Sequence, residues 1–154
     1  MDYQLLKQQV QEMVKEESYL ITLLSNTSAL LYQSMENLNW LGYYLYRDSQ
    51  LILGPFQGKV ACEIIPLNKG VCGKAARDRE TVLVKDVHQF EGHIACDSAS
   101  NSEIVIPIII NDQLFGVLDI DSPLIGRFNE DDQANLEEIV RIMERQISQF
   151  SRCC

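Results

Sequence analysis

The strongest constraint on the fold is a hairpin signal in the C-terminal half of the chain. Two β-rich runs, Glu103–Ile110 and Gln113–Asp121, are separated only by Asn111-Asp112. Two-residue turns of this composition join antiparallel strands. Asp48-Ser49 is a second turn signal between two further β-rich runs. Consecutive strands joined by tight turns favour an antiparallel sheet rather than a parallel one.

The other elements are predicted from periodicity and turn residues. Residues 1–36 carry apolar residues at helical spacing, and the polar stretch 25–28 predicts a break into two helices. Asn129 or Asp131 can cap a last helix. The remaining expected elements are strands at Asn39–Tyr46, Gln50–Phe56, Val60–Ile65 and Thr81–Val84, a short helix at Gly70–Asp78 and a long polar loop at Lys85–Ser102. The expected class is α+β, with helices packed on one face of the sheet.

Length and charge exclude several classes of protein. The 154 residues suit one domain, with N-terminal helices at about 1–36 and a core at about 39–150. A net charge of −9 argues against binding to nucleic acid or anionic lipid. The longest apolar run is far shorter than the ~20 residues of a membrane helix. The first residues are too charged for a signal peptide, so we expect a cytoplasmic protein. Its cysteines, including Cys153 and Cys154 on a frayed tail, should be reduced at rest.

Three cysteines lie inside the expected fold, at Cys62, Cys72 and Cys96. No Cys-x-x-Cys motif occurs, and nothing in the spacing favours a metal site with His93. One interpretation is that all three are small buried residues. In another, the N-terminus of the expected helix lowers the pKa of Cys72, and the polar loop leaves Cys96 accessible and reactive.

A second group of residues is acidic. Asp119 and Asp121 are two apart on one expected strand, so both point to one sheet face, and Glu103 begins the partner strand. They could form a solvated face. Their neighbours are mostly apolar, however, and crowded carboxylates near apolar walls raise at least one pKa, as a general acid needs. Such a group could also bind an ammonium ion. Trp40, in the aromatic run, could belong to the core or to a pocket.

These segments resemble the free methionine-(R)-sulfoxide reductases, which are single GAF-domain enzymes. The resemblance extends from about Asn39 to Asp131. It is carried by Gly58-Lys59-Val60-Ala61-Cys62, Gly70-Val71-Cys72-Gly73, Asp86-Val87-His88, Gly92-His93-Ile94-Ala95-Cys96-Asp97-Ser98-Ala99-Ser100, Ser102-Glu103-Ile104-Val105 and Gly116-Val117-Leu118-Asp119-Ile120-Asp121-Ser122. It implies a six-stranded antiparallel sheet with helices on one side and a pocket on the other, in a homodimer.

The resemblance also implies the chemistry. The substrate would be free L-methionine (R)-S-oxide, reduced to methionine without a metal or organic cofactor. Cys96 would be the nucleophile, Cys62 the resolving cysteine and Cys72 an alternative or relay thiol. The residues alone do not rank Cys62 against Cys72 as the resolving partner. A thioredoxin-like reductant would reduce the resulting disulfide. The pocket would be lined by Trp40, Glu103, Asp119 and Asp121.

Two other functions remain open, because a fold does not fix a function. The domain could bind a small molecule without turnover, in which case it would consume no reductant with methionine sulfoxide. It could also be a redox sensor that uses Cys96. A sensor of that kind would not need Asp119, Asp121 and Trp40 around one pocket.

Overall fold

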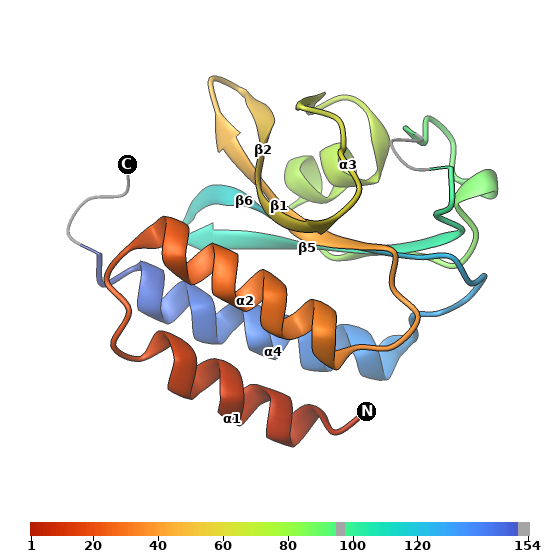
Figure 1. Cartoon of the computed structure of the whole chain (residues 1–154). Helices are drawn as coiled ribbons and strands as arrows, with labels where there is room; N and C mark the ends of the chain where they lie inside the picture. Colours follow the sequence, from red (N-terminus) through yellow and green to blue (C-terminus); the bar gives the residue numbers. More distant parts are fainter. Residues whose placement is uncertain (95–97, 151–154) are drawn as a thin grey trace.

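The computed structural model describes residues 1–94 and 98–150. A six-stranded sheet in the order β3-β2-β1-β6-β5-β4 forms the centre of the fold, and every neighbouring pair is antiparallel. This confirms the expected α+β class (Figure 1). The elements are α1 (Tyr3–Val14), α2 (Leu20–Ser34), β1 (Trp40–Arg47), β2 (Gln50–Gly58), β3 (Ile64–Pro66), α3 (Gly70–Asp78), β4 (Val82–Val84), the 3-10 helix η1 (Val87–Gln89), β5 (Ser102–Ile110), β6 (Gln113–Ser122) and α4 (Glu130–Ile147).

Both predicted hairpins are present, and their turns have the backbone that the residue types suggest. Asn111 and Asp112, between β5 and β6, have φ angles of 51° and 64°. Asp48 and Ser49, between β1 and β2, have φ angles of 53° and 63°. Two successive left-handed residues form the tight turn whose twist matches that of paired strands. The turns therefore set the register of both hairpins.

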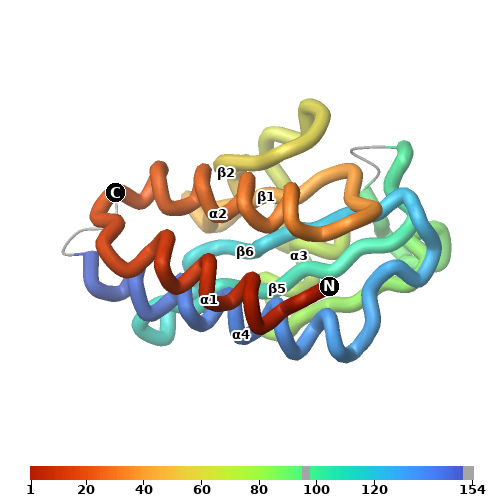
Figure 2. Tube along the Cα trace, turned by 60° about the horizontal axis from the view of Figure 1, so that its bottom comes forward, coloured from red at the N-terminus to blue at the C-terminus, as the bar shows by residue number. Residues whose placement is uncertain are grey.

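The two faces of the sheet carry different layers. Helices α1, α2 and α4 cover one face, as Figure 2 shows from the helix side, and α3 lies on the opposite face. Alternation along β1 divides its side chains between these layers. Leu41 and Tyr43 are buried in the core under the three long helices, whereas Trp40 and Tyr44 belong to a second cluster with α3. The polar groups described below lie on the α3 face.

The predicted helix break at 25–28 is wrong. Helix α2 runs through these residues, because its polar side chains find partners inside the fold. The Thr27 hydroxyl donates to Leu23 O at 2.7 Å and lies 2.8 Å from the Tyr43 hydroxyl. The actual break lies between α1 and α2, where a Glu17 carboxylate oxygen accepts from the N–H groups of the next two residues.

The structure also defines where β3 and α4 begin. The strand expected at Val60–Ile65 is shortened to β3, so the segment from Lys59 to Glu63 is a loop without regular structure. Helix α4 begins at the predicted cap Asn129, whose side chain accepts from the Asp132 N–H in a reciprocal capping box. None of the described helices is both long and apolar enough to cross a bilayer.

Candidate active site

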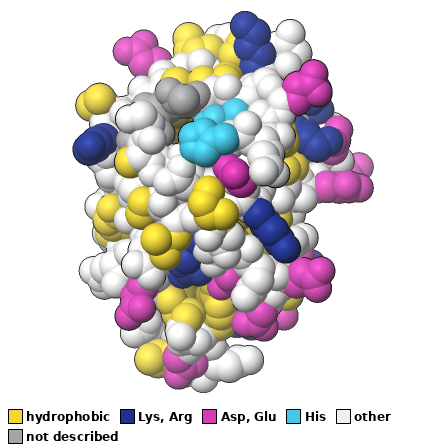
Figure 3. Space-filling view, turned by 90° about the vertical axis from the view of Figure 1, so that its right-hand side faces the viewer, with side chains coloured by type: hydrophobic (Ala, Val, Ile, Leu, Met, Phe, Trp, Pro, Cys, Tyr) yellow, Lys and Arg dark blue, Asp and Glu magenta, His cyan; other side chains and the backbone are white. Residues whose placement is uncertain are grey.

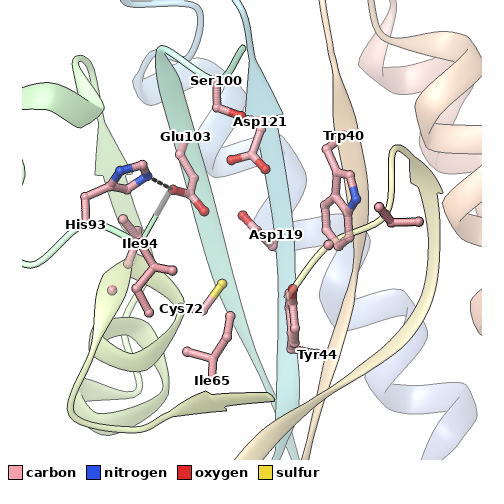
Figure 4. Close-up of a pocket in the computed structure, with 14 residues that line it drawn as sticks. Trp40, Tyr44, Ile65, Cys72, His93, Ile94, Ser100, Glu103, Asp119 and Asp121 are labelled. Carbon is pink, nitrogen blue, oxygen red and sulfur yellow. Dashed lines mark ion pairs between the residues drawn. The ribbon is translucent and has the colours of Figure 1, made fainter. Parts of the chain in front are cut away.

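A pocket opens on the α3 face of the sheet, on the side away from the three long helices (Figure 4). Its cavity volume is about 40 Å³, so its enclosed part suits a small ligand. The structure brings together the predicted residues Trp40, Glu103, Asp119 and Asp121, with Cys72 beside them. The full lining is Trp40, Tyr44, Val60, Ala61, Ile65, Gly70, Val71, Cys72, His93, Ile94, Ser100, Glu103, Asp119 and Asp121.

Strand register explains why the acidic residues meet. Asp121 on β6 lies opposite Glu103 on β5 and opposite Trp40 on β1. Asp119 is two residues earlier on β6 and therefore points to the same face. Glu103 and Asp119 are each only 6% exposed. Glu103 and Asp119 are thus removed from water, whereas Asp121 is partly exposed, so a fully solvated acidic face does not describe this group.

Burial changes the protonation of this group. Desolvation raises the pKa of Glu103 well above its ordinary value, and the negative charge of Asp121 raises it further. Desolvation and the neighbouring Glu103 likewise raise the pKa of Asp119. Within the described residues, Asp119 Oδ1 is buried without a hydrogen-bond partner. The pocket wall therefore holds carboxyl groups whose protonated form is favoured by burial, and an oxygen that a ligand can satisfy.

Cys72 is not the activated thiol that its helix position suggested. It is a buried free thiol near the start of α3. Burial raises its pKa well above the ordinary value, and the negative charges of Asp119 and Glu103 act in the same direction. These effects outweigh the helix N-terminus, which was expected to lower the pKa. Cys72 is therefore held in the thiol form.

The sulfur of Cys72 and one oxygen each of Glu103 and Asp119 lie within 4.8 Å of one another. Thiolates and carboxylates are common ligands of divalent metals. A metal, however, needs these groups deprotonated, whereas burial and mutual repulsion favour their protonated forms. The cluster is therefore better suited to donating protons and hydrogen bonds than to holding an ion.

Of the other predicted thiols, only Cys62 lies within the described part of the chain. Cys62 is disulfide-bonded, and Cys72 is free, so these two do not pair with each other. Cys96, Cys153 and Cys154 lie outside the described residues. The loop on the N-terminal side of Cys96 contributes His93 and Ile94 to the pocket lining.

Trp40 forms a fixed aromatic wall. Its ring stacks on Phe56 at 5.2 Å between centroids and on Tyr44 at 5.9 Å. Its indole N–H donates to Lys59 O at 3.1 Å. Gly58 permits this approach, because a Cβ atom there would lie 2.7 Å from Trp40 Cδ1, and its φ of 128° disfavours any side chain.

Sequence reasoning missed three polar residues of the pocket, Tyr44, His93 and Ser100. Tyr44 is four residues after Trp40 on one strand, so alternation could have placed it on the same face. His93 Nε2 lies 3.6 Å from Glu103 Oε1, and burial lowers the pKa of His93. On the face of the molecule that Figure 3 shows, histidine side chains reach the surface beside an acidic side chain.

Comparison with known proteins identifies the family of this chain. The model of the GAF domain matches residues 23–147. The chain is 52% identical over 133 residues to the free methionine-R-sulfoxide reductase of Escherichia coli, a match that covers 86% of this chain and 80% of that protein.

Two solved structures are also close. The reduced form of fRMsr of Staphylococcus aureus has a TM-score of 0.93 and 52% identity, over 95% of both chains. The free methionine-R-sulfoxide reductase of Neisseria meningitidis, solved in complex with its substrate, has a TM-score of 0.90 and 39% identity, over 94% of this chain and 87% of that one. On the strength of these matches, the chain belongs to the free methionine-R-sulfoxide reductase family of GAF-domain proteins.

Proposed function

We propose that this protein reduces free L-methionine (R)-S-oxide to L-methionine. The observation that carries the proposal is the buried acid pair, Glu103 and Asp119, facing a pocket walled by Trp40. A sulfoxide sulfur becomes a good target for a thiolate only while its oxygen is being protonated. A carboxyl group with a raised pKa supplies that proton at neutral pH. The relatives named above support the same substrate.

In the proposed mechanism, the Cys96 thiolate attacks the substrate sulfur while Glu103 or Asp119 protonates the oxygen. The oxygen passes to Cys96 as a sulfenic acid, and methionine leaves. Cys62 then attacks the sulfenic sulfur, an S–S bond forms, and the S–O bond breaks with release of water. The disulfide state of Cys62 supports its role as the resolving thiol. The buried, protonated Cys72 is less suited to that role.

Substrate orientation is assigned to the remaining pocket groups. The ammonium group of the free amino acid is expected to face the acidic cluster through Asp119 and Asp121, which offers the unpaired Asp119 oxygen a donor. The S-methyl group is expected to lie against the indole of Trp40, since sulfur and methyl groups pack well on aromatic rings. No metal or organic cofactor takes part.

The cycle needs a dithiol donor to reduce the Cys62 disulfide, and we propose a thioredoxin-like protein for this role. Such donors operate in a reducing compartment, which supports a cytoplasmic location. We also propose that the protein is a homodimer, which sedimentation or light scattering would measure.

The decisive experiment is steady-state turnover of free L-methionine (R)-S-oxide with thioredoxin and thioredoxin reductase. Sustained reductant consumption with stoichiometric methionine formation is expected. A GAF domain that only binds a ligand would consume no reductant. A redox sensor would oxidise and be reduced without forming methionine. Either result would refute the proposed reductase activity.

A further inference from the structure

The loop that carries Cys62 is held by the strands beside it, although it has no regular structure. Three of its carbonyl groups accept hydrogen bonds from side chains or backbone of β1 and β2. Lys59 O accepts from the Trp40 indole at 3.1 Å, and Cys62 O accepts from the Tyr44 hydroxyl at 2.8 Å. Glu63 O accepts from the Leu53 N–H at 2.9 Å. The backbone of the redox cysteine is therefore fixed on both sides and at its own carbonyl.

The contact from Tyr44 acts on Cys62 directly. Burial raises the pKa of Tyr44, and the negative charge of Asp119 raises it further, so the hydroxyl remains a donor. The ring is stacked on Trp40, and the side chain is 2% exposed. A donor on a rigid strand thus holds the carbonyl of a residue on an irregular loop. The loop offers no repeating backbone bonds that would do this instead.

We infer that Tyr44 is a positioning residue for the resolving step, with its hydroxyl holding the Cys62 backbone so that the thiol can attack the sulfenic acid. This inference rests on the proposed function. The step forms the S–S bond between Cys62 and Cys96 and breaks the S–O bond of the sulfenic acid. The Cys62 proton and the departing hydroxide leave as water, so Cys62 is oxidised by the sulfenic acid and no further oxidant is needed.

The inference separates the two halves of the reaction. Release of methionine depends on Cys96 and the acid cluster, whereas disulfide formation also depends on where Cys62 is held. Loss of one buried hydrogen bond is equivalent to about a fivefold change in an equilibrium or rate. Tyr44→Phe keeps the ring and its stacking and removes only the donor. It should therefore slow disulfide formation more than methionine release, by about fivefold or more.

Tyr43→Phe is the matched control. Tyr43 is the next residue on β1 and is also buried, but its hydroxyl lies in the opposite layer, 2.8 Å from the Thr27 hydroxyl. The Tyr43→Phe variant should lose a comparable hydrogen bond without affecting the loop that carries Cys62. Both rates are measured in one turnover of reduced enzyme with excess free L-methionine (R)-S-oxide. Methionine is quantified directly, and the sulfenic acid is trapped with dimedone and counted against the disulfide by mass spectrometry.

The expected result is a dimedone-reactive enzyme that persists in Tyr44→Phe and not in Tyr43→Phe. Wild-type disulfide formation in Tyr44→Phe would overturn the inference. Equal slowing of methionine release and disulfide formation in Tyr44→Phe would also overturn it, since that would point to substrate binding. Equal slowing of disulfide formation in Tyr43→Phe would overturn it too, since that would point to general stability. Failure of the proposed function would differ from all of these, because the wild-type enzyme itself would release no methionine.

Discussion

At the scale of single residues, the acid pair is the most sensitive part of the site. Asp119→Asn keeps the size of the side chain and removes the acidic proton. Losing a general acid typically costs ~10²–10⁴-fold in rate. We expect a loss in this range in methionine release during the first turnover, and a similar or smaller loss for Asp121→Asn. Asp112→Asn, at an exposed turn that Asn also tolerates, is the control. Wild-type kinetics in both pocket variants would exclude Asp119 and Asp121 from catalysis.

The same pair predicts how stability depends on pH. Asp119 has an ordinary pKa of 3.8 and a raised pKa in the folded protein, so the folded state binds more protons above about pH 4. Stability should therefore fall as pH rises through this window. Asp119→Asn removes this contribution. The melting temperature of the variant relative to wild type should rise as the pH increases above about 4, and scanning calorimetry measures it. A pH-independent difference would show that the Asp119 pKa is ordinary.

At the scale of elements, the sequence predicts correctly the features that neighbouring residues determine, such as turns and the alternation of side chains along a strand. Turn residues at Asp48-Ser49 and Asn111-Asp112 placed two hairpins, and alternation on β6 placed Asp119 and Asp121 on one face. The wrong predictions concern features that depend on contacts with residues distant in the sequence. The sequence of α2 does not show that Tyr43 on β1 will partner Thr27, so residues 25–28 appeared to break the helix. Likewise, the position of Cys72 near the start of a helix suggested a lowered thiol pKa, but burial among carboxyl groups raises that pKa.

The α2 contact can be tested directly. The Thr27 hydroxyl joins α2 to β1 through Tyr43. Thr27→Val keeps the shape of the side chain while removing that bond and the local bond to Leu23 O. A buried hydrogen bond contributes about 1 kcal/mol, so the free energy of unfolding in urea should fall by roughly that amount beyond the loss caused by removing a local bond. Ser28→Ala is the control, because the Ser28 hydroxyl donates a local hydrogen bond within α2, to Ser25 O at 2.8 Å. Equal losses in both variants would contradict a special role for the link between the elements.

At the scale of the whole molecule, the sheet separates the larger hydrophobic core on one face from the pocket on the other. The three long helices bury one face and form the larger core. In the described part of the chain, the other face is covered by α3, the short 3-10 helix η1 and loops, which leaves room for a pocket with buried acids. A small, partly enclosed pocket of this kind contrasts with an open groove that could accept a polypeptide. The architecture therefore has a consequence for the form of the substrate.

The pocket should accept methionine sulfoxide only as the free amino acid. Its acidic cluster, with the unpaired Asp119 oxygen, is matched to an ammonium group, which N-acetylation or a peptide bond removes. We expect N-acetyl and peptide-bound methionine sulfoxide to react far more slowly than the free form, mainly through a raised KM. The S epimer should also react poorly, because it exchanges oxygen and methyl between the acid pair and Trp40. Turnover assays with the resolved epimers and their N-acetyl forms measure both effects. Comparable rates on peptide-bound sulfoxide, or on both epimers, would contradict the assigned orientation in the pocket.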